Sequence, residues 1–169
     1  WGGQNEGFTK EKWFPSLTNY FDKLESILGL KVIIAPHPKV KDEKYPSYYG
    51  GREISEFVLA ESALNSELII SHWSSGLSFG VIYNKPIMLV TSNELINNEG
   101  FTRQQNQFSK ELGSEIINID SKISEENLKK SLIIDKTKYN DYFLNYCSSR
   151  VDKKRNYQLI SDIIKNKYM

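Results

Sequence analysis

Apolar residues recur every three or four positions across residues 14–28, which is the spacing of a single stripe along a helix. Pro15 fits the first turn of such a helix, and Gly29 fits its C-terminal cap. The β-branched run KVIIAP follows at residues 31–36. Runs of this kind are typical of strands that are buried on both faces of a parallel sheet. The chain therefore opens with a predicted helix and then a predicted strand.

The rest of the chain alternates short apolar runs with helical patterns. Further strands are predicted near residues 67–70, 87–90 and 115–119, because each is a short apolar run between polar segments. Helices are predicted over residues 55–65, 75–83, 102–112, 124–132, 137–148 and 153–167. Residues 40–52 and 91–100 are expected to form loops. This order predicts an α/β fold, a Rossmann-like open parallel sheet with helices on both faces and a helical C-terminus.

Composition supports a folded chain and excludes several classes of protein. Of 169 residues, 39% are hydrophobic and 25% are charged, which is far from the composition of a disordered chain. A net charge of +1 gives no general attraction to nucleic acid, which is therefore not an expected partner. Cys147 has no second cysteine to pair with, and no Cys/His cluster has the spacing of a metal site. We therefore expect a reduced, cytoplasmic protein that uses neither a metal nor a bound cofactor.

The chain is short enough to form one domain, so residues 1–169 are expected to be a single Rossmann-like unit. Residues 1–9 are polar and glycine-rich and are interpreted as a linker, and residues 136–169 as C-terminal helices. The longest apolar runs are far shorter than the roughly 20 residues that span a bilayer. Because the chain begins with Trp1 and has no signal-peptide pattern, we expect a fragment of a longer protein.

A polar segment follows the first predicted strand, and open α/β sheets bind ligands outside the carboxyl ends of their strands. His37, Pro38 and Lys39 form this segment. A histidine at such a position donates to a phosphate or a ribose hydroxyl, or else bonds a backbone carbonyl as an ordinary strand cap. Both interpretations remain open for His37, and the cationic Lys39 favours an anionic ligand.

The second polar segment, SHWSSG, covers residues 71–76 between a predicted strand and a predicted helix. Ser71, Ser74, Ser75 and Gly76 are the candidate ligand-binding residues of this segment. They offer hydroxyls, backbone N–H groups and the positive end of a helix dipole, which together suit an anion. Serine is also a preferred helix N-cap whatever the ligand, and taken alone this motif favours the cap.

Aromatic residues near these segments are candidates to stack on a base or a sugar, although such residues more often anchor loops. They are Tyr45, Tyr48, Tyr49 and Trp73. Arg52 is predicted to flank the same cleft, where it is a further candidate for contact with a sugar or base. The glycine-rich phosphate and dinucleotide motifs are absent, as is the Gly-x-Ser-x-Gly nucleophile motif. The sequence therefore assigns no catalytic residue.

Three segments together resemble a known family. VIIAPHPK, SELIISHWSSGLSFGVIYNKPIMLVTSNEL and LGSEIINID lie within roughly residues 30–120. They resemble the C-terminal, nucleotide-binding half of GT-B glycosyltransferases that build bacterial capsule or lipopolysaccharide, particularly sialyltransferase-like and Kdo-transferase-like proteins with His-Pro and paired Ser motifs. The resemblance implies that His37 and Pro38 contact the nucleotide phosphate or ribose of a sugar donor. It likewise implies that Ser74 and Ser75 contact the phosphate.

The same resemblance implies a metal-independent glycosyltransferase whose donor is a nucleotide sugar, CMP-linked donors included, and whose acceptor is a surface carbohydrate. GT-B enzymes bind the acceptor on an N-terminal domain that this chain lacks, so the chain alone is expected to be poorly active. The full-length protein is expected at the inner face of the membrane. Two alternatives stay open: a related glycerophosphotransferase or nucleotide-sugar epimerase, or a non-catalytic Rossmann-like interaction module.

Overall fold

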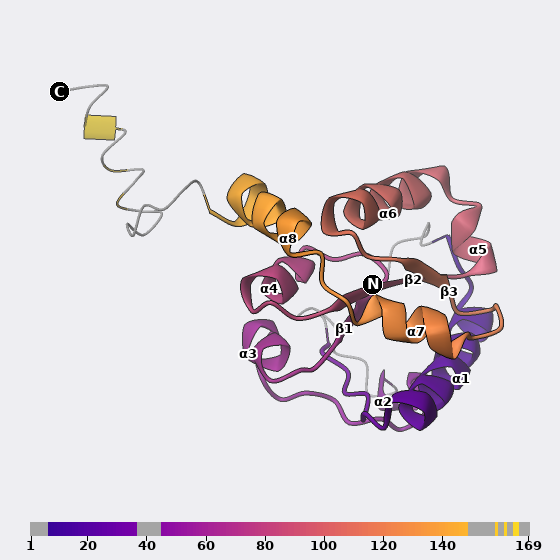
Figure 1. Cartoon of the computed structure of the whole chain (residues 1–169). Coiled ribbons are helices and arrows are strands. Elements are labelled where there is room, and N and C mark those ends of the chain that lie inside the picture. Colours follow the sequence, from indigo (N-terminus) through magenta and orange to yellow (C-terminus); the bar gives the residue numbers. More distant parts are fainter. Residues whose placement is uncertain (1–6, 37–44, 149–157, 159–160, 162–163, 166–169) are drawn as a thin grey trace.

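A computed structural model describes residues 7–36 and 45–148, together with residues 158, 161, 164 and 165 (Figure 1). At its centre lies a three-stranded parallel sheet in the order β1-β2-β3. The strands are β1 (Ile69–Ser71), β2 (Ile87–Thr91) and β3 (Ile116–Asn118). In the register of the sheet, Ile70 lies opposite Met88, and Val90 lies opposite Ile117.

Helices connect these strands and cover the sheet (Figure 1). They are α1 (Lys10–Leu28), α2 (Tyr45–Tyr48), α3 (Leu59–Leu64), α4 (Leu77–Ile82), α5 (Asn93–Ile96), α6 (Glu99–Leu112), α7 (Glu125–Ser131) and α8 (Lys136–Tyr142). A short π-helix, η1 (Phe143–Cys147), continues α8. Parallel strands need crossover connections. The helix α4 provides one between β1 and β2, and α5 and α6 provide the next.

The two faces of β2 belong to two separate cores, because successive side chains of a strand point to opposite faces. Met88 and Val90 pack in a core with the buried side of α1 and with Leu128 of α7. Ile87 and Leu89 pack in the other core with residues of α4, α6 and α8. Every residue of β2 is buried. The predicted α/β fold, with a Rossmann-like open parallel sheet between helices, is confirmed.

The first helix is confirmed but begins earlier than predicted. It starts at Lys10, and Trp13 extends its buried stripe toward the N-terminus. Thr9 is the N-cap residue, yet its own side chain makes no capping bond. Instead, Glu94 accepts a hydrogen bond from the Thr9 backbone N–H at 2.8 Å. At the other end, Gly29 adopts φ 66° and its N–H donates to the Glu25 carbonyl oxygen, as predicted for a C-cap.

The prediction of a buried strand over residues 31–36 is wrong. The described structure has only an isolated parallel bridge there, between Ile34 and Ile54. The Ile34 backbone donates to the Glu53 carbonyl at 2.9 Å and accepts from the Ser55 N–H at 2.8 Å, so a loop takes its hydrogen bonds. Ile34 is buried while Ile33 is 51% exposed. The segment is therefore buried on one side only, whereas a central strand of a parallel sheet is buried on both faces.

Other boundaries also differ from the prediction. Residues 91–100 contain α5 and the start of α6 instead of a continuous loop, because Ser92 and Asn98 each cap a helix through their side chains. The predicted helix over residues 137–148 ends in η1. Most of the predicted helix over residues 153–167, and residues 1–6 of the predicted linker, lie outside the described residues. None of the helices in the described ranges is long and apolar enough to span a bilayer.

Candidate functional site

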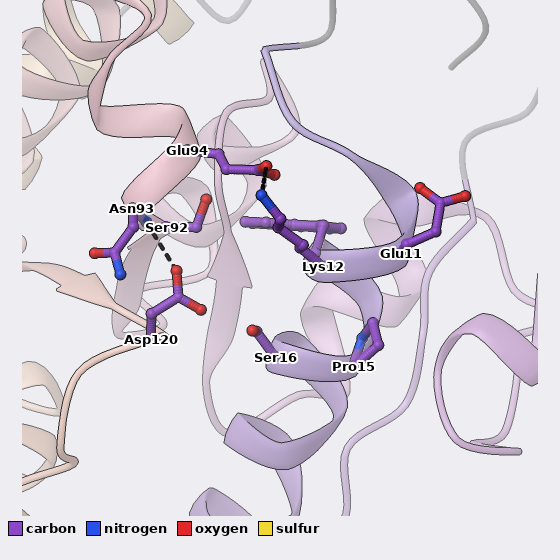
Figure 2. A pocket seen from close by; sticks show the side chains of 9 residues that line it. Glu11, Lys12, Pro15, Ser16, Ser92, Asn93, Glu94 and Asp120 are labelled. Carbon is purple, nitrogen blue, oxygen red and sulfur yellow. Dashed lines mark hydrogen bonds and ion pairs between the residues drawn. The ribbon is translucent and has the colours of Figure 1, made fainter.

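The three strands end at one edge of the sheet, with Ser71, Thr91 and Asn118 as their last residues. Open parallel sheets place ligands at this carboxyl edge. Two features occupy it here. One is the segment of residues 71–76, which we call the serine turn, and the other is a pocket between α1 and the ends of β2 and β3 (Figure 2).

In the serine turn, neither Ser74 nor Ser75 caps α4 with its side chain. The N-cap residue of α4 is Gly76, and no side chain makes a capping hydrogen bond there. The Ser74 hydroxyl accepts instead from the Gly76 N–H at 3.0 Å, which tightens the turn itself. Both serines are exposed. The ordinary N-cap interpretation is therefore wrong, and two hydroxyls stand at the edge of the sheet in reach of a ligand.

Gly76 packs closely against side chains within the same turn. A Cβ at this position would lie 2.6 Å from Cδ2 of Leu59 and 3.1 Å from the Ser74 hydroxyl oxygen. A larger residue would therefore require the Leu59 and Ser74 side chains to move aside. The predicted part played by Gly76 in ligand binding is not tested by this packing and stays a prediction.

His72, between Ser71 and the exposed serines, is held among aromatic rings. Its ring centroid lies 5.7 Å from that of Trp13, edge-on, and 6.1 Å from that of Phe101, stacked. Burial lowers the pKa of His72 to about 4, because the charged imidazolium loses its hydration there. The ring is neutral at pH 7, so it packs as an aromatic group and adds no positive charge to the site.

The side chain of Gln105 anchors the start of the serine turn. It is 2% exposed, and its Nε2 donates to the His72 carbonyl oxygen at 2.9 Å and to the Val90 carbonyl oxygen at 2.8 Å. One amide of α6 therefore joins the residue after β1 to a residue of β2. Sequence reasoning missed Gln105, because a glutamine within a helix carries no local signal of such long-range bonds.

The candidate aromatic contacts separate into exposed and packed side chains. Trp73 is 48% exposed beside the serine turn and lies edge-on to Phe101, with 6.4 Å between ring centroids. Tyr48 stacks on Phe14 at 4.7 Å, and Tyr49 packs edge-on against the same ring at 5.3 Å. Trp73 is therefore exposed beside the serine turn, and its predicted contact with a base or sugar stays a prediction, whereas Tyr48 and Tyr49 anchor their loop to α1. The side chain of Tyr45 lies outside the described residues.

Arg52 points toward α1. Its Nη2 lies 2.6 Å from Asp22 Oδ1 and 2.7 Å from Glu25 Oε2, and its side chain is 8% exposed. The guanidinium also lies over the Phe21 ring, 5.4 Å from the centroid. These contacts fix the loop before residue 53 to α1. They use the guanidinium for packing, and so give no support to the prediction that Arg52 contacts a sugar or base.

The pocket at this edge has a volume of about 500 Å³. One wall is the first part of α1, with Glu11, Lys12, Trp13, Pro15 and Ser16. The other wall follows β2 and β3 and consists of Ser92, Asn93, Glu94 and Asp120. Sequence reasoning missed this pocket, because its two walls come from segments that are far apart in the chain, with Ser16 on one wall and Ser92 the nearest residue in sequence on the other.

Two fixed polar contacts shape the pocket (Figure 2). Lys12 Nζ pairs with Glu94 Oε1 at 3.0 Å, and the Asn93 backbone N–H donates to Asp120 Oδ2 at 2.8 Å. The Thr9 N–H and Lys12 hold the pKa of Glu94 below its usual value, so its carboxylate is ionised at pH 7. Asn118 Nδ2 donates to Asn93 Oδ1 at 2.8 Å and ties the ends of β2 and β3 together.

The lining of the pocket carries three carboxylates against one ammonium group, so it is net acidic. It adjoins the serine turn through Trp13, which lines the pocket and also contacts His72. Among the described residues, no three His, Cys, Asp or Glu side chains gather as a set of metal ligands.

The predicted segment His37, Pro38 and Lys39 lies outside the described residues. Its predicted contacts with a nucleotide phosphate or ribose therefore stay predictions. Of the described candidates, the structure brings Ser71, Ser74, Ser75, Gly76 and Trp73 to one edge of the sheet and directs Tyr49 and Arg52 to α1. Comparison of the chain with family models, with curated proteins and with solved structures gives no match in any of the three.

Proposed function

We propose that this chain is the donor-binding domain of a glycosyltransferase of GT-B type that uses a nucleotide sugar to build surface carbohydrate. The observation that carries the proposal is the exposed serine turn at the carboxyl edge of a parallel sheet, with a pocket adjoining it. The sequence resemblance adds the class of ligand. In this proposal the donor phosphate binds at the serine turn and the donor sugar binds in the adjoining pocket, both at the carboxyl edge of the sheet.

The phosphate is assigned to Ser74 and Ser75. Their hydroxyls are exposed, and the backbone turns between residues 74 and 79 by successive hydrogen bonds from i+3 N–H groups. The N–H groups of residues 76–79 already donate within the turn, so in the proposal the two serine hydroxyls are the donors that meet the phosphate oxygens. In the proposal, His37 and Lys39 add donors from the neighbouring segment, and Trp73 offers an exposed ring on which a base or sugar stacks.

The size of the pocket suits the rest of such a donor. Pockets for small molecules commonly have about 300 to 1,000 Å³, and the pocket between α1 and β3 has about 500 Å³. Its contact with the serine turn runs through Trp13 and His72. A nucleotide sugar with its phosphate at Ser75 therefore has room at the same edge for its hydroxylated part.

The alternative of an interaction module based on the tyrosine-rich loop has less support. Tyr48 and Tyr49 pack on Phe14 of α1 and are not displayed together for a partner chain. The alternative of other GT-B-fold chemistry, by a glycerophosphotransferase or an epimerase, uses the same donor edge. Analysis of the products formed by the full-length protein separates that alternative from sugar transfer.

Calorimetric titration with CMP, UDP, CDP and GDP tests the proposal. We expect one nucleotide to bind preferentially, and Ser75→Ala or His37→Ala to weaken that binding about tenfold, since a hydrogen bond to a charged group contributes about 1.5 kcal/mol or more. Ser26→Ala is the matched control, because Ser26 is exposed near the C-terminal end of α1. Absence of binding by all four nucleotides, or equal affinity in the Ser75→Ala protein, would contradict the proposal.

A further inference from the structure

The surface around α3 displays apolar side chains to water while its serines are half-buried. Four apolar residues there are 41% to 70% exposed: Phe57, Val58, Leu59 and Leu64. The hydroxyls of Ser55 and Ser62 bond each other at 2.7 Å, and the Phe57 N–H donates to the Ser55 oxygen at 3.2 Å. These bonds fix the turn before α3 with its apolar residues outward. We call residues 57–64 the α3 patch, and a gathering of exposed apolar groups of this kind marks a binding surface.

The α3 patch lies in an acidic part of the chain. Residues 54–84 contain three glutamates and no lysine, arginine or aspartate. These glutamates, Glu56, Glu61 and Glu67, are all exposed. Opposite charges on two surfaces attract them to each other and select the partner. An apolar surface among exposed glutamates therefore fits a segment that is both apolar on one side and basic.

The chain itself contains such a segment, at residues 149–169. Six lysine or arginine residues against two aspartates give this segment a charge of +4. The sequence predicts a helix over residues 153–167, and five apolar residues fall on one half of the surface of such a helix. They are Tyr157, Leu159, Ile160, Ile163 and Ile164. Of these, Ile164 is among the described residues and is 53% exposed. Both the charge and the apolar face of the segment complement the α3 patch.

The described part of the chain leads this segment toward the α3 patch. The π-helix η1 contacts α4, and α4 contacts α3, so α8, α4 and α3 follow one another along the sheet (Figure 1). Packed helices lie about 8 to 10 Å apart, so crossing α4 takes roughly 16 to 20 Å. The four residues 149–152 span about 13 Å when extended. They cover most of that crossing, and a helix over residues 153–167, about 22 Å long, covers the rest.

We infer that the α3 patch is the docking surface for the chain's own residues 153–167. The apolar half of this helix covers the apolar residues of the patch, and its lysines and arginine lie near the glutamates of residues 54–84. The inference does not rest on the proposed function, because residues 57–64 are not among the proposed donor-binding residues.

A nitroxide spin label tests this docking in the full chain. Gln158→Cys carries the label, because Gln158 is exposed and lies opposite the apolar half of the predicted helix. Cys147→Ala leaves the chain with this single thiol. We expect the label to broaden the backbone amide signals of residues 57–64.

Two substitutions should weaken the docking from its two sides. Val58→Asn should lower the docking constant about fivefold, as expected for the loss of one partly buried valine, and the broadening should fall with it. It keeps the start of α3, because Val58 is the N-cap residue and asparagine is a preferred N-cap. Ile160→Asn, in the segment itself, should have a similar effect without altering α3.

Ile96→Asn is the matched control, because Ile96 is 49% exposed at the end of α5, on the far side of the molecule from α3 (Figure 1). It should leave the broadening unchanged. Sharp signals at residues 57–64 in the labelled chain, or equal broadening after Val58→Asn and Ile160→Asn, would overturn the inference. So would broadening that arises only between copies, when a spin-labelled chain is mixed with an isotope-labelled one, because the occupant would then be a second copy.

Discussion

The side-chain amide of Gln105 donates to the carbonyl oxygen of His72 at 2.9 Å, and so α6 holds the residue that follows β1. The same nitrogen donates to Val90 of β2 at 2.8 Å. The position of the serine turn relative to the sheet therefore depends on one buried side-chain amide. That amide belongs to α6, a helix that contributes no candidate ligand-binding residue.

Gln105→Leu should loosen the serine turn and destabilise the chain. It removes both bonds and leaves two carbonyl oxygens without their donor, at a cost of about 1 to 3 kcal/mol each if no water replaces it. Urea denaturation measures the loss, and hydrogen exchange should quicken at residues 73–77. Gln107→Leu is the control, because Gln107 is exposed on the same helix and its Nε2 donates to Glu111 Oε1 at 3.0 Å, away from the serine turn. Unchanged exchange at the turn in Gln105→Leu would refute the role of Gln105.

The low pKa of His72 predicts a stability that falls in acid. The folded-state pKa is about 4 and the usual value is 6.5, so between these values the unfolded chain binds the extra proton. The free energy of unfolding should therefore decrease by about 2.5 kcal/mol as the pH falls from 6.5 to 4. His72→Phe should remove this dependence in that window.

Carboxylates act on stability in a lower range of pH. Arg52 holds the pKa of Glu25 below its usual 4.5, so its contribution is present above that value and is lost as the pH falls further. The pH range in which His72 affects stability thus lies mostly above the pH range in which Glu25 affects it.

The prediction for His72 is checked by following the titration of its imidazole by NMR. A pKa near 6.5 would contradict the argument that burial keeps this ring neutral.

Arg52→Met should destabilise the chain by about 1 to 3 kcal/mol, because it leaves the carboxylate of Glu25 without its charged donor in a partly buried place. Lys31→Met removes a comparable ion pair, with Glu53 at 2.7 Å, but both of those side chains are more than half exposed. We expect little change from it. Equal losses for the two variants in thermal unfolding would show that burial of Arg52 does not matter.

Gly80→Ala should also destabilise the chain, by about 1 to 3 kcal/mol through overpacking. A Cβ at Gly80 would lie 2.7 Å from Ile87 Cγ1 and 3.1 Å from Ile69 Cδ1, between α4 and the sheet. Ile87→Val in addition should recover part of the loss. Gly100→Ala is the control on another helix, since its Cβ would meet only Asn98 Oδ1, at 3.6 Å. Neutral behaviour of Gly80→Ala in denaturant titrations would contradict the packing argument.

Local patterns in the sequence predict the first helix, the strand at β2 and the capped helix α7 well. The helical stripe, the short apolar run and the Ser124 cap are each contained within a few residues. The run at residues 31–36 has the composition of a buried strand. It fails to become one because the loop at Glu53 and Ser55 takes the hydrogen bonds of Ile34.

The candidate site likewise has one part that the sequence predicts and one part that it does not. The position of the serine turn follows from the order of strand and helix, so the sequence predicts it. The pocket does not follow, because it depends on Glu94 meeting Thr9 and Lys12, more than 80 residues away. Local sequence patterns also do not predict the ion pair between Arg52 and Glu25, because the two residues belong to different segments of the chain.

The most direct test of the central claim is to locate a bound nucleotide on the chain. Backbone amide shifts should be followed while the preferred one of CMP, UDP, CDP and GDP is added. We expect the largest shifts at Ser74, Ser75 and Gly76, with smaller shifts along the pocket at Ser92 and Asn93. Shifts confined to the opposite edge of the sheet, or no shifts at saturating nucleotide, would contradict a donor site at the carboxyl edge.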